Sequence, residues 1–181
     1  KAPIIATHSN ARTVTDHPRN MSDDMLRLIA KNGGVVQLTM LSDYLRKAPE
    51  NPERDSALES LRASLKPSNE MTEDERKLAR DQLRKIRAQY PDPLATVKNA
   101  VDHIDHIVRI AGIDHVGIGC DFDGGGGIDG VFDVSEVMNI TIELAQRGYS
   151  EQDIEKIWSG NILRVFAEVQ AVAEGIQSQT L

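Results

Sequence analysis

Three short apolar runs stand out along the chain, at residues 3–7, 33–39 and 116–124, and each stops at Gly, Asp, His or Thr. Runs of this length without polar alternation predict strands that are buried on both faces, as in a parallel sheet. Helical patterns lie between and after them, in the order strand, helix, strand, long helical region, strand, helices. This alternation is typical of a parallel α/β fold.

The helix predicted after the first run has clear start and stop signals. Asn20 and Ser22 are candidate N-caps, two aspartates follow in the first turn, and Asn32 with Gly33 ends it. We expect its apolar positions to face the sheet; these are Met25, Leu26, Leu28 and Ile29.

Residues 43–93 interrupt the rhythm with a charged, helix-prone stretch that contains several prolines. Thr72 and the acidic residues after it predict a helix that runs to about Gln89. We interpret the stretch as a helical excursion between two strands. An elaborated crossover is favoured over a lid or a subunit contact.

A helix predicted at about 94–111 carries Asp102, His103 and His106, which are potential metal ligands at helical spacing. The apolar residues of this helix define a separate buried face. We therefore favour surface residues with local hydrogen bonds over a metal site, and interpret His115 in the same way.

Composition limits the classes of partner. The chain has 181 residues, 40% hydrophobic, with a net charge of −7 and no basic cluster, which argues against a nucleic-acid partner. No apolar stretch approaches the roughly 20 residues of a membrane span. Because Cys120 is the single cysteine, no disulfide can form within the chain, and the cysteine content leaves both cytoplasm and periplasm open as the compartment. We interpret Cys120 as a buried strand residue in preference to a reactive thiol.

Two strand ends carry candidate chemistry. The third run ends at Asp121, followed by a glycine-rich loop, and the first ends at His8. Catalytic carboxylates in α/β barrels stand at such positions, and a histidine fixed by a strand is a common zinc ligand. From the residues alone, a turn-forming Asp121 and a structural His8 remain alternatives. The loop fits neither a calcium loop, since Phe132 replaces the required twelfth-position Glu, nor a phosphate loop.

Several motifs together resemble the renal (membrane) dipeptidase family, whose members are zinc-dependent peptidases of the amidohydrolase superfamily. The motifs occur in the family's order, and the resemblance spans most of the chain outside 43–93. They are THSNAR at 7–12, HPRN at 17–20, GGVV at 33–36, DHIDH at 102–106, GIGCDFDG at 117–124 and WSGNILRVF at 158–166.

The resemblance implies a (β/α)₈ TIM barrel that hydrolyses dipeptides, L,D-dipeptides included, with two zinc ions per complete active site. It implies that His8, from the sixth strand, is a metal ligand and that Arg19 binds the substrate's carboxylate. Asp121, from the eighth strand, is then a catalytic residue that also binds substrate. A homodimer is a further expectation.

Parts of the family pattern are missing. The first-strand His-x-Asp pair, the bridging Glu, the other zinc-binding His and a substrate-contacting His have no counterpart here. Three strands cannot close a barrel of roughly 250 residues. We therefore expect residues 1–181 to be the C-terminal part of a single catalytic barrel domain, about three strand–helix units, that needs an N-terminal part absent from this chain as its partner.

Two alternatives stay open. One is a related metal-dependent amidohydrolase that acts on another amide or a lactam. The other is a non-catalytic homologue, against which the joint presence of His8, Arg19 and Asp121 argues.

Overall fold

The computed structural model describes residues 2–178 and divides the chain into two compact units. One consists of Lys1–Lys47 and Leu94–Leu181, and the other of Ala48–Pro93. The second unit therefore corresponds closely to the excursion expected at 43–93.

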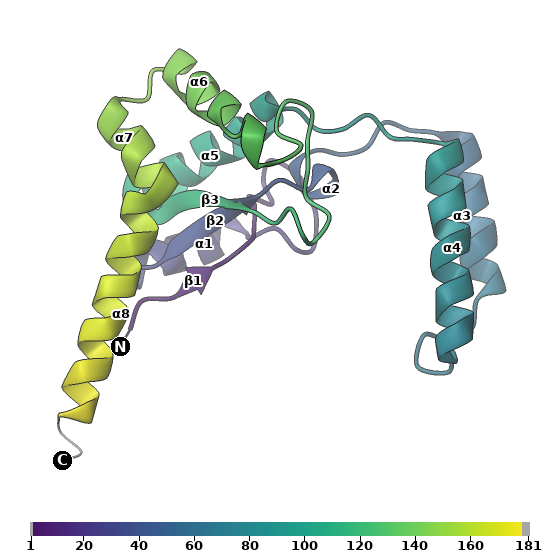
Figure 1. Ribbon diagram of the computed structural model, residues 1–181, viewed down its shortest axis with the longest axis horizontal. Coiled ribbons are helices and arrows are strands. Elements are labelled where there is room, and N and C mark those ends of the chain that lie inside the picture. Colours follow the sequence, from purple (N-terminus) through teal and green to yellow (C-terminus); the bar gives the residue numbers. More distant parts are fainter. Residues whose placement is uncertain (1, 179–181) are drawn as a thin grey trace. The chain divides into compact units, whose positions relative to one another are not determined.

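The first unit is built on a three-stranded parallel sheet in the order β1-β2-β3 (Figure 1). The strands are β1 (Ile5–Ala6), β2 (Val35–Thr39) and β3 (Val116–Cys120). Ile5 pairs with Val35, and Val36 pairs with Val116, so β2 lies in the centre. This confirms the α/β fold and the three strands, although the first strand is shorter than its apolar run.

Helices α1 (Asp23–Lys31) and α5 (Val97–Ala111) pack on one face of the sheet, behind it in Figure 1. Ser22 caps α1, and Thr96 with Asn99 forms a capping box that starts α5. Alternate residues of β2, Val36 and Leu38, join the buried core with α5. Local capping and the alternation of side chains thus account for this layer.

The buried stripe of α1 is narrower than the sequence predicts. Leu26 and Ile29 are buried, but Met25 and Leu28 are 45% and 64% exposed. Residues three apart share a helix face more closely than adjacent residues do, so one sheet contact cannot cover all four side chains.

The C-terminal helices fasten the beginnings of the strands. Glu151–Glu155 (α7) continues through a π-turn at Lys156–Gly160 (η3) into α8 (Asn161–Gln177). Asn161 Nδ2 donates to the carbonyl oxygens of Ile113 and Val116, 2.7 and 2.8 Å away, just before and at the start of β3. Arg164 donates to the carbonyl of Gly33, just before β2. These bonds leave the opposite ends of the strands to the loops.

Shorter elements complete this unit: α2 (Ser42–Leu45), η1 (Ile113–His115), η2 (Val134–Glu136) and α6 (Met138–Gln146). Among residues 2–178, no helix is long and apolar enough to cross a membrane.

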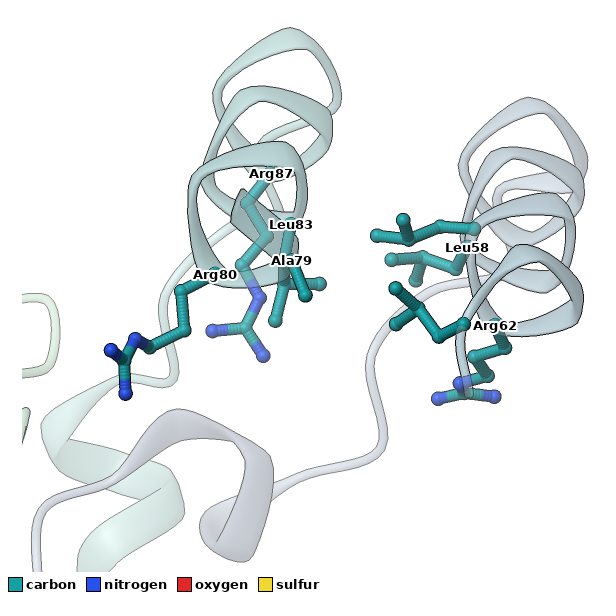
Figure 2. A pocket seen from close by; sticks show the side chains of 8 residues that line it. Leu58, Arg62, Ala79, Arg80, Leu83 and Arg87 are labelled. Atoms are coloured by element: carbon teal, nitrogen blue, oxygen red, sulfur yellow. The ribbon is translucent and has the colours of Figure 1, made fainter. Parts of the chain in front are cut away.

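The second unit is a pair of helices, α3 (Pro52–Ser64) and α4 (Glu73–Gln89). The α4 bounds agree with the predicted helix, and its capping box joins Thr72 to Glu75. Figure 2 shows Leu58 of α3 and Leu83 of α4 directed into the groove between the helices, whose volume is about 290 Å³.

Arg147 joins α5 to α6 through three carboxylates. Its guanidinium lies 2.7 Å from Asp102 and Asp105 and 2.8 Å from Glu143, with the arginine side chain 22% exposed. Removal of a partly buried cation would leave three anions close together without compensation.

We predict that Arg147→Met lowers the free energy of unfolding by about 2 kcal/mol, because partly buried charged groups lose their partner. Arg27→Met is the matched control, since its pair with Asp24 is exposed and worth at most about 0.5 kcal/mol. Urea unfolding of both variants would measure the difference. Equal losses would contradict the prediction.

Candidate active site at the ends of the strands

The candidate site lies at the C-terminal edge of the sheet. His8 follows β1 and Asp121 follows β3, and these strands flank β2. The central strand β2 is one inter-strand spacing, about 5 Å, from each of its neighbours. The parallel topology thus brings two residues 113 positions apart in sequence to the same edge.

His8 is held by groups on both sides of its ring. Nδ1 lies 2.7 Å from Thr7 Oγ1, and Nε2 lies 2.9 Å from the Arg19 guanidinium. A guanidinium can only donate, so Nε2 carries the lone pair and Nδ1–H donates to Thr7. This tautomer presents Nε2 as an acceptor, and the structure joins His8 directly to Arg19.

The segment between His8 and Asn20, here the 8–20 loop, is folded against the ends of the strands. Asn10 is buried and pairs with the backbone of β2: its Oδ1 accepts from Thr39 N–H, and its Nδ2 donates to Thr39 O, both at 3.1 Å. Asn20, which is also buried, donates to the carbonyls of Thr15 and Tyr44. Both ends of the loop are therefore tied down.

Asp121 begins a tight loop that ends at Gly127, here the 121–127 loop. The backbone of Cys120 and Asp121 is left-handed, with φ of 46° and 69°. Non-glycine residues rarely adopt this conformation, and it concentrates at functional sites. Gly126 N–H donates to Asp121 O at 2.8 Å, which folds the loop back over the strand end.

Gly124 makes room for the Asp121 carboxylate. A Cβ atom on Gly124 would lie 2.8 Å from Asp121 Cγ and closer still to Oδ1. Any side chain at position 124 would therefore push the carboxylate away. Glycine is needed at position 124 because its lack of a side chain leaves space for the Asp121 carboxylate.

Two glycines of β3 allow a similar approach on the inner face of the sheet. A Cβ on Gly119 would lie 2.5 Å from the carbonyl oxygen of Thr7, the residue before His8, and one on Gly117 would overlap Gln37 Oε1. Gly119 thus lets the end of β1 come close to β3, and Gly117 leaves room for the Gln37 side chain of β2.

Cys120 is half-buried, and burial raises the pKa of its thiol. A neutral thiol is a poor nucleophile. This agrees with the interpretation of Cys120 as a strand residue.

His103 and His106 do not lie on the surface of α5, as the sequence analysis favoured, but are buried with 0% and 5% exposure. His106 lies 2.7 Å from both Asp23 and Arg109. His103 bonds to the backbone of the 8–20 loop and of Leu45. The pattern of apolar residues did not predict their burial. Polar rings can be buried here because groups on other elements form hydrogen bonds with their nitrogens. Half-buried His115 bonds to Gly34 O at 2.7 Å.

Comparisons with known proteins identify the family of the chain. Residues 1–180 match the family model described as membrane dipeptidase, peptidase family M19. The chain belongs to the membrane dipeptidase family. The chain is 33% identical to an uncharacterized dipeptidase of Schizosaccharomyces pombe and 33% identical to Dipeptidase 3 of Rattus norvegicus. Each match covers 96% of this chain but only 32% and 27% of those proteins.

Solved structures match the fold of the chain. The probable dipeptidase PvdM from Pseudomonas aeruginosa superposes with a TM-score of 0.81 and 40% identity, over 94% of this chain and 46% of that one. A metallo peptidase from Rhodobacter sphaeroides, liganded with a phosphinate mimic of the dipeptide L-Ala-D-Ala, gives 0.65 and 26%, over 93% and 36%. The chain thus spans about a quarter to a half of the length of these relatives.

The sequence analysis proposed His8, Arg19 and Asp121 as site residues but did not predict the contacts that hold this region in place. Asn10, Asn20, Gly124 and His103 act through contacts with distant backbone or with Asp121. Only the position of Asn10 and Asn20 beside the candidate residues was a signal, and it did not indicate their partners.

Proposed function

We propose that this chain is the C-terminal part of a zinc-dependent dipeptidase and contributes His8, Arg19 and Asp121 to its active site. The observation that carries the proposal is the contact of Arg19 with His8 Nε2 at the strand edge where Asp121 also stands. A metal-binding imidazole, a carboxylate-binding guanidinium and a proton-carrying carboxylate are the groups that dipeptide hydrolysis needs.

The rest of a (β/α)₈ barrel would complete the site. Among the described residues, β1 and β3 each pair with one strand only, β2, and each leaves an edge open. Open edges of a parallel sheet need cover or a further strand. The greater length of the membrane dipeptidase relatives supports the same conclusion. A homodimer stays a prediction.

His8 suits one position in a metal site. Its Nδ1–H is fixed by Thr7, as second-shell hydrogen bonds fix metal-binding histidines, and Nε2 keeps the lone pair. Residues 2–178 contain no group of three or more His, Cys, Asp or Glu placed to hold a metal ion. A zinc site needs at least three protein ligands, so the others would come from the remaining barrel strands. Two zinc ions in the complete site would polarise the scissile carbonyl and activate water.

Arg19 would bind the free carboxylate of the dipeptide. Its planar guanidinium forms paired hydrogen bonds with a carboxylate, and the 8–20 loop holds it near His8. A metal ion bound to His8 Nε2 would take the lone pair that Arg19 now uses, so the guanidinium would be free to bind the carboxylate. The distance from His8 to Arg19 then selects substrates whose carboxylate lies close to the scissile bond.

Asp121 would hold the substrate's ammonium group and transfer a proton to the leaving amine. Its place beyond a buried strand, with Gly124 against the carboxylate, supports a fixed position for the charge.

The direct test uses the full-length enzyme with an L,L- and an L,D-dipeptide. We expect cleavage that a chelator abolishes and added zinc restores. No cleavage of either dipeptide by a folded, zinc-loaded enzyme would reject the proposal. Cleavage of other amides or lactams in the same panel would then favour the related amidohydrolase, and failure to bind zinc a non-catalytic homologue.

Arg19→Ala should raise KM about 10- to 100-fold and change kcat little, because it removes a charged hydrogen bond that substrate and transition state share. A dipeptide amide, which lacks the carboxylate, should be cleaved equally by parent and variant. Arg27→Ala is the matched control, since Arg27 lies on α1 and pairs only with the exposed Asp24. A loss confined to kcat would contradict the assignment.

Gly124→Ala should lower kcat at least about tenfold, since the new methyl displaces the Asp121 carboxylate from its productive position. KM should change less if the carboxylate acts mainly on the proton. Gly175→Ala on α8 is the control, because a Cβ there has no neighbour within 4 Å. Steady-state kinetics with equal zinc content would measure the effect, and an unchanged kcat would exclude a role for this packing.

A further inference from the structure

His103 contacts the 8–20 loop, which carries His8 and Arg19, at Ala11 and Thr15. It lies on α5, fully buried, and its Nδ1 accepts a hydrogen bond from Ala11 N–H at 3.0 Å. On the other side of the ring, Nε2 lies 3.0 Å from Leu45 O. Thr15 Oγ1 is a more distant neighbour of Nε2, at 3.4 Å.

These partners determine the tautomer. A backbone N–H can only donate and a carbonyl oxygen can only accept, so the proton resides on Nε2 and the lone pair on Nδ1. Burial lowers the pKa of His103 to about 4. The ring is therefore neutral at physiological pH, and its lone pair stays available to Ala11.

Ala11 is a buried residue in the segment that joins His8 to Arg19. It lies three residues after His8 and eight before Arg19 and is itself fully buried. Its carbonyl accepts from Thr15 N–H, and the next residue, Arg12, pairs with Met21 O. A displacement of Ala11 would therefore move the segment that joins His8 to Arg19.

Backbone hydrogen bonds to Met21 hold the residues on either side of Ala11, since Met21 N–H donates to Asn10 O and Arg12 N–H donates to Met21 O, but neither bond uses the Ala11 N–H. Asn10 and Asn20 fasten the loop at its ends, to β2 and to the segment near Leu45. Between them, His103 gives Ala11 N–H its acceptor, from a residue 92 positions away. A buried amide left without an acceptor costs enough free energy to shift a loop.

We propose that His103 is a positioning residue for the active site, which sets the places of His8 and Arg19 through its hydrogen bond to Ala11. This inference rests on the proposed dipeptidase function. It assigns to α5 a role in the reaction beyond packing, since the helix holds the loop without reaching the substrate.

Two variants separate the two ends of the ring in the full-length enzyme. In His103→Asn, the side-chain oxygen can occupy the place of Nδ1 and accept from Ala11, but Leu45 loses its donor. In His103→Gln, the amide reaches the place of Nε2 and Leu45, but Ala11 loses its acceptor. Both variants should lower the melting temperature, because each breaks one buried hydrogen bond.

The readouts are kcat/KM, zinc content and hydrogen exchange of the Ala11 amide. We expect His103→Gln to lower kcat/KM by about 10- to 100-fold and to speed Ala11 exchange, because a small misplacement of the loop has a large effect on rate. His103→Asn should keep kcat/KM within about threefold of the parent and preserve Ala11 protection. Tyr149→Phe is the control: it removes a 2.7 Å bond to Asp105 of the same helix, away from the loop.

The outcomes are distinguishable. If the parent cleaves dipeptides and His103→Gln has the kcat/KM of Tyr149→Phe, the positioning role is wrong. Equal losses in the Asn and Gln variants, in proportion to their melting temperatures, would reduce His103 to a structural residue. If the parent cleaves no dipeptide, the proposed function fails, whereas unchanged Ala11 exchange in His103→Gln would independently refute the support of the loop.

Discussion

Parallel hydrogen bonding of β1 and β3 to the two sides of β2 places the C-terminal ends of all three strands at one edge of the sheet. Everything proposed for the site depends on this constraint. His8 and Asp121 face the same region only because their strands run in the same direction, with helices as crossovers. The fastening of the strand beginnings by Asn161 and Arg164 leaves the other ends to loops that carry chemistry.

The two loops at this edge are positioned by different physical means. The 8–20 loop is held by buried polar groups: Asn10 and Asn20 bond to backbone atoms, and His103 supports Ala11. The 121–127 loop is held by backbone conformation and by glycine packing around Asp121. Hydrogen bonds orient the imidazole and the guanidinium, while steric limits orient the carboxylate. Each arrangement limits the freedom of the side chains proposed to act on the substrate.

Membership of the membrane dipeptidase family and the partial overlap with its members have a common structural meaning. The chain contributes a continuous group of strand–helix units, and the sheet still has unpaired strand edges within residues 2–178. If the proposed metal site is assembled from both parts of a barrel, the proposed hydrolysis depends on their association. The helical pair at Ala48–Pro93 forms its own compact unit.

The sequence by itself determined the features that depend on near neighbours. Hydrophobic runs predicted the three strands, and Ser22 and Thr72 marked the starts of α1 and α4. Position after a strand marked His8 and Asp121 as candidate site residues. Only the tertiary structure decided the contact of Arg19 with His8, the space at Gly124 and the burial of His103. Caps and periodicity act over a few residues, whereas these contacts join segments up to 92 residues apart, and nothing in the local pattern specifies which distant backbone group will complete a buried hydrogen bond.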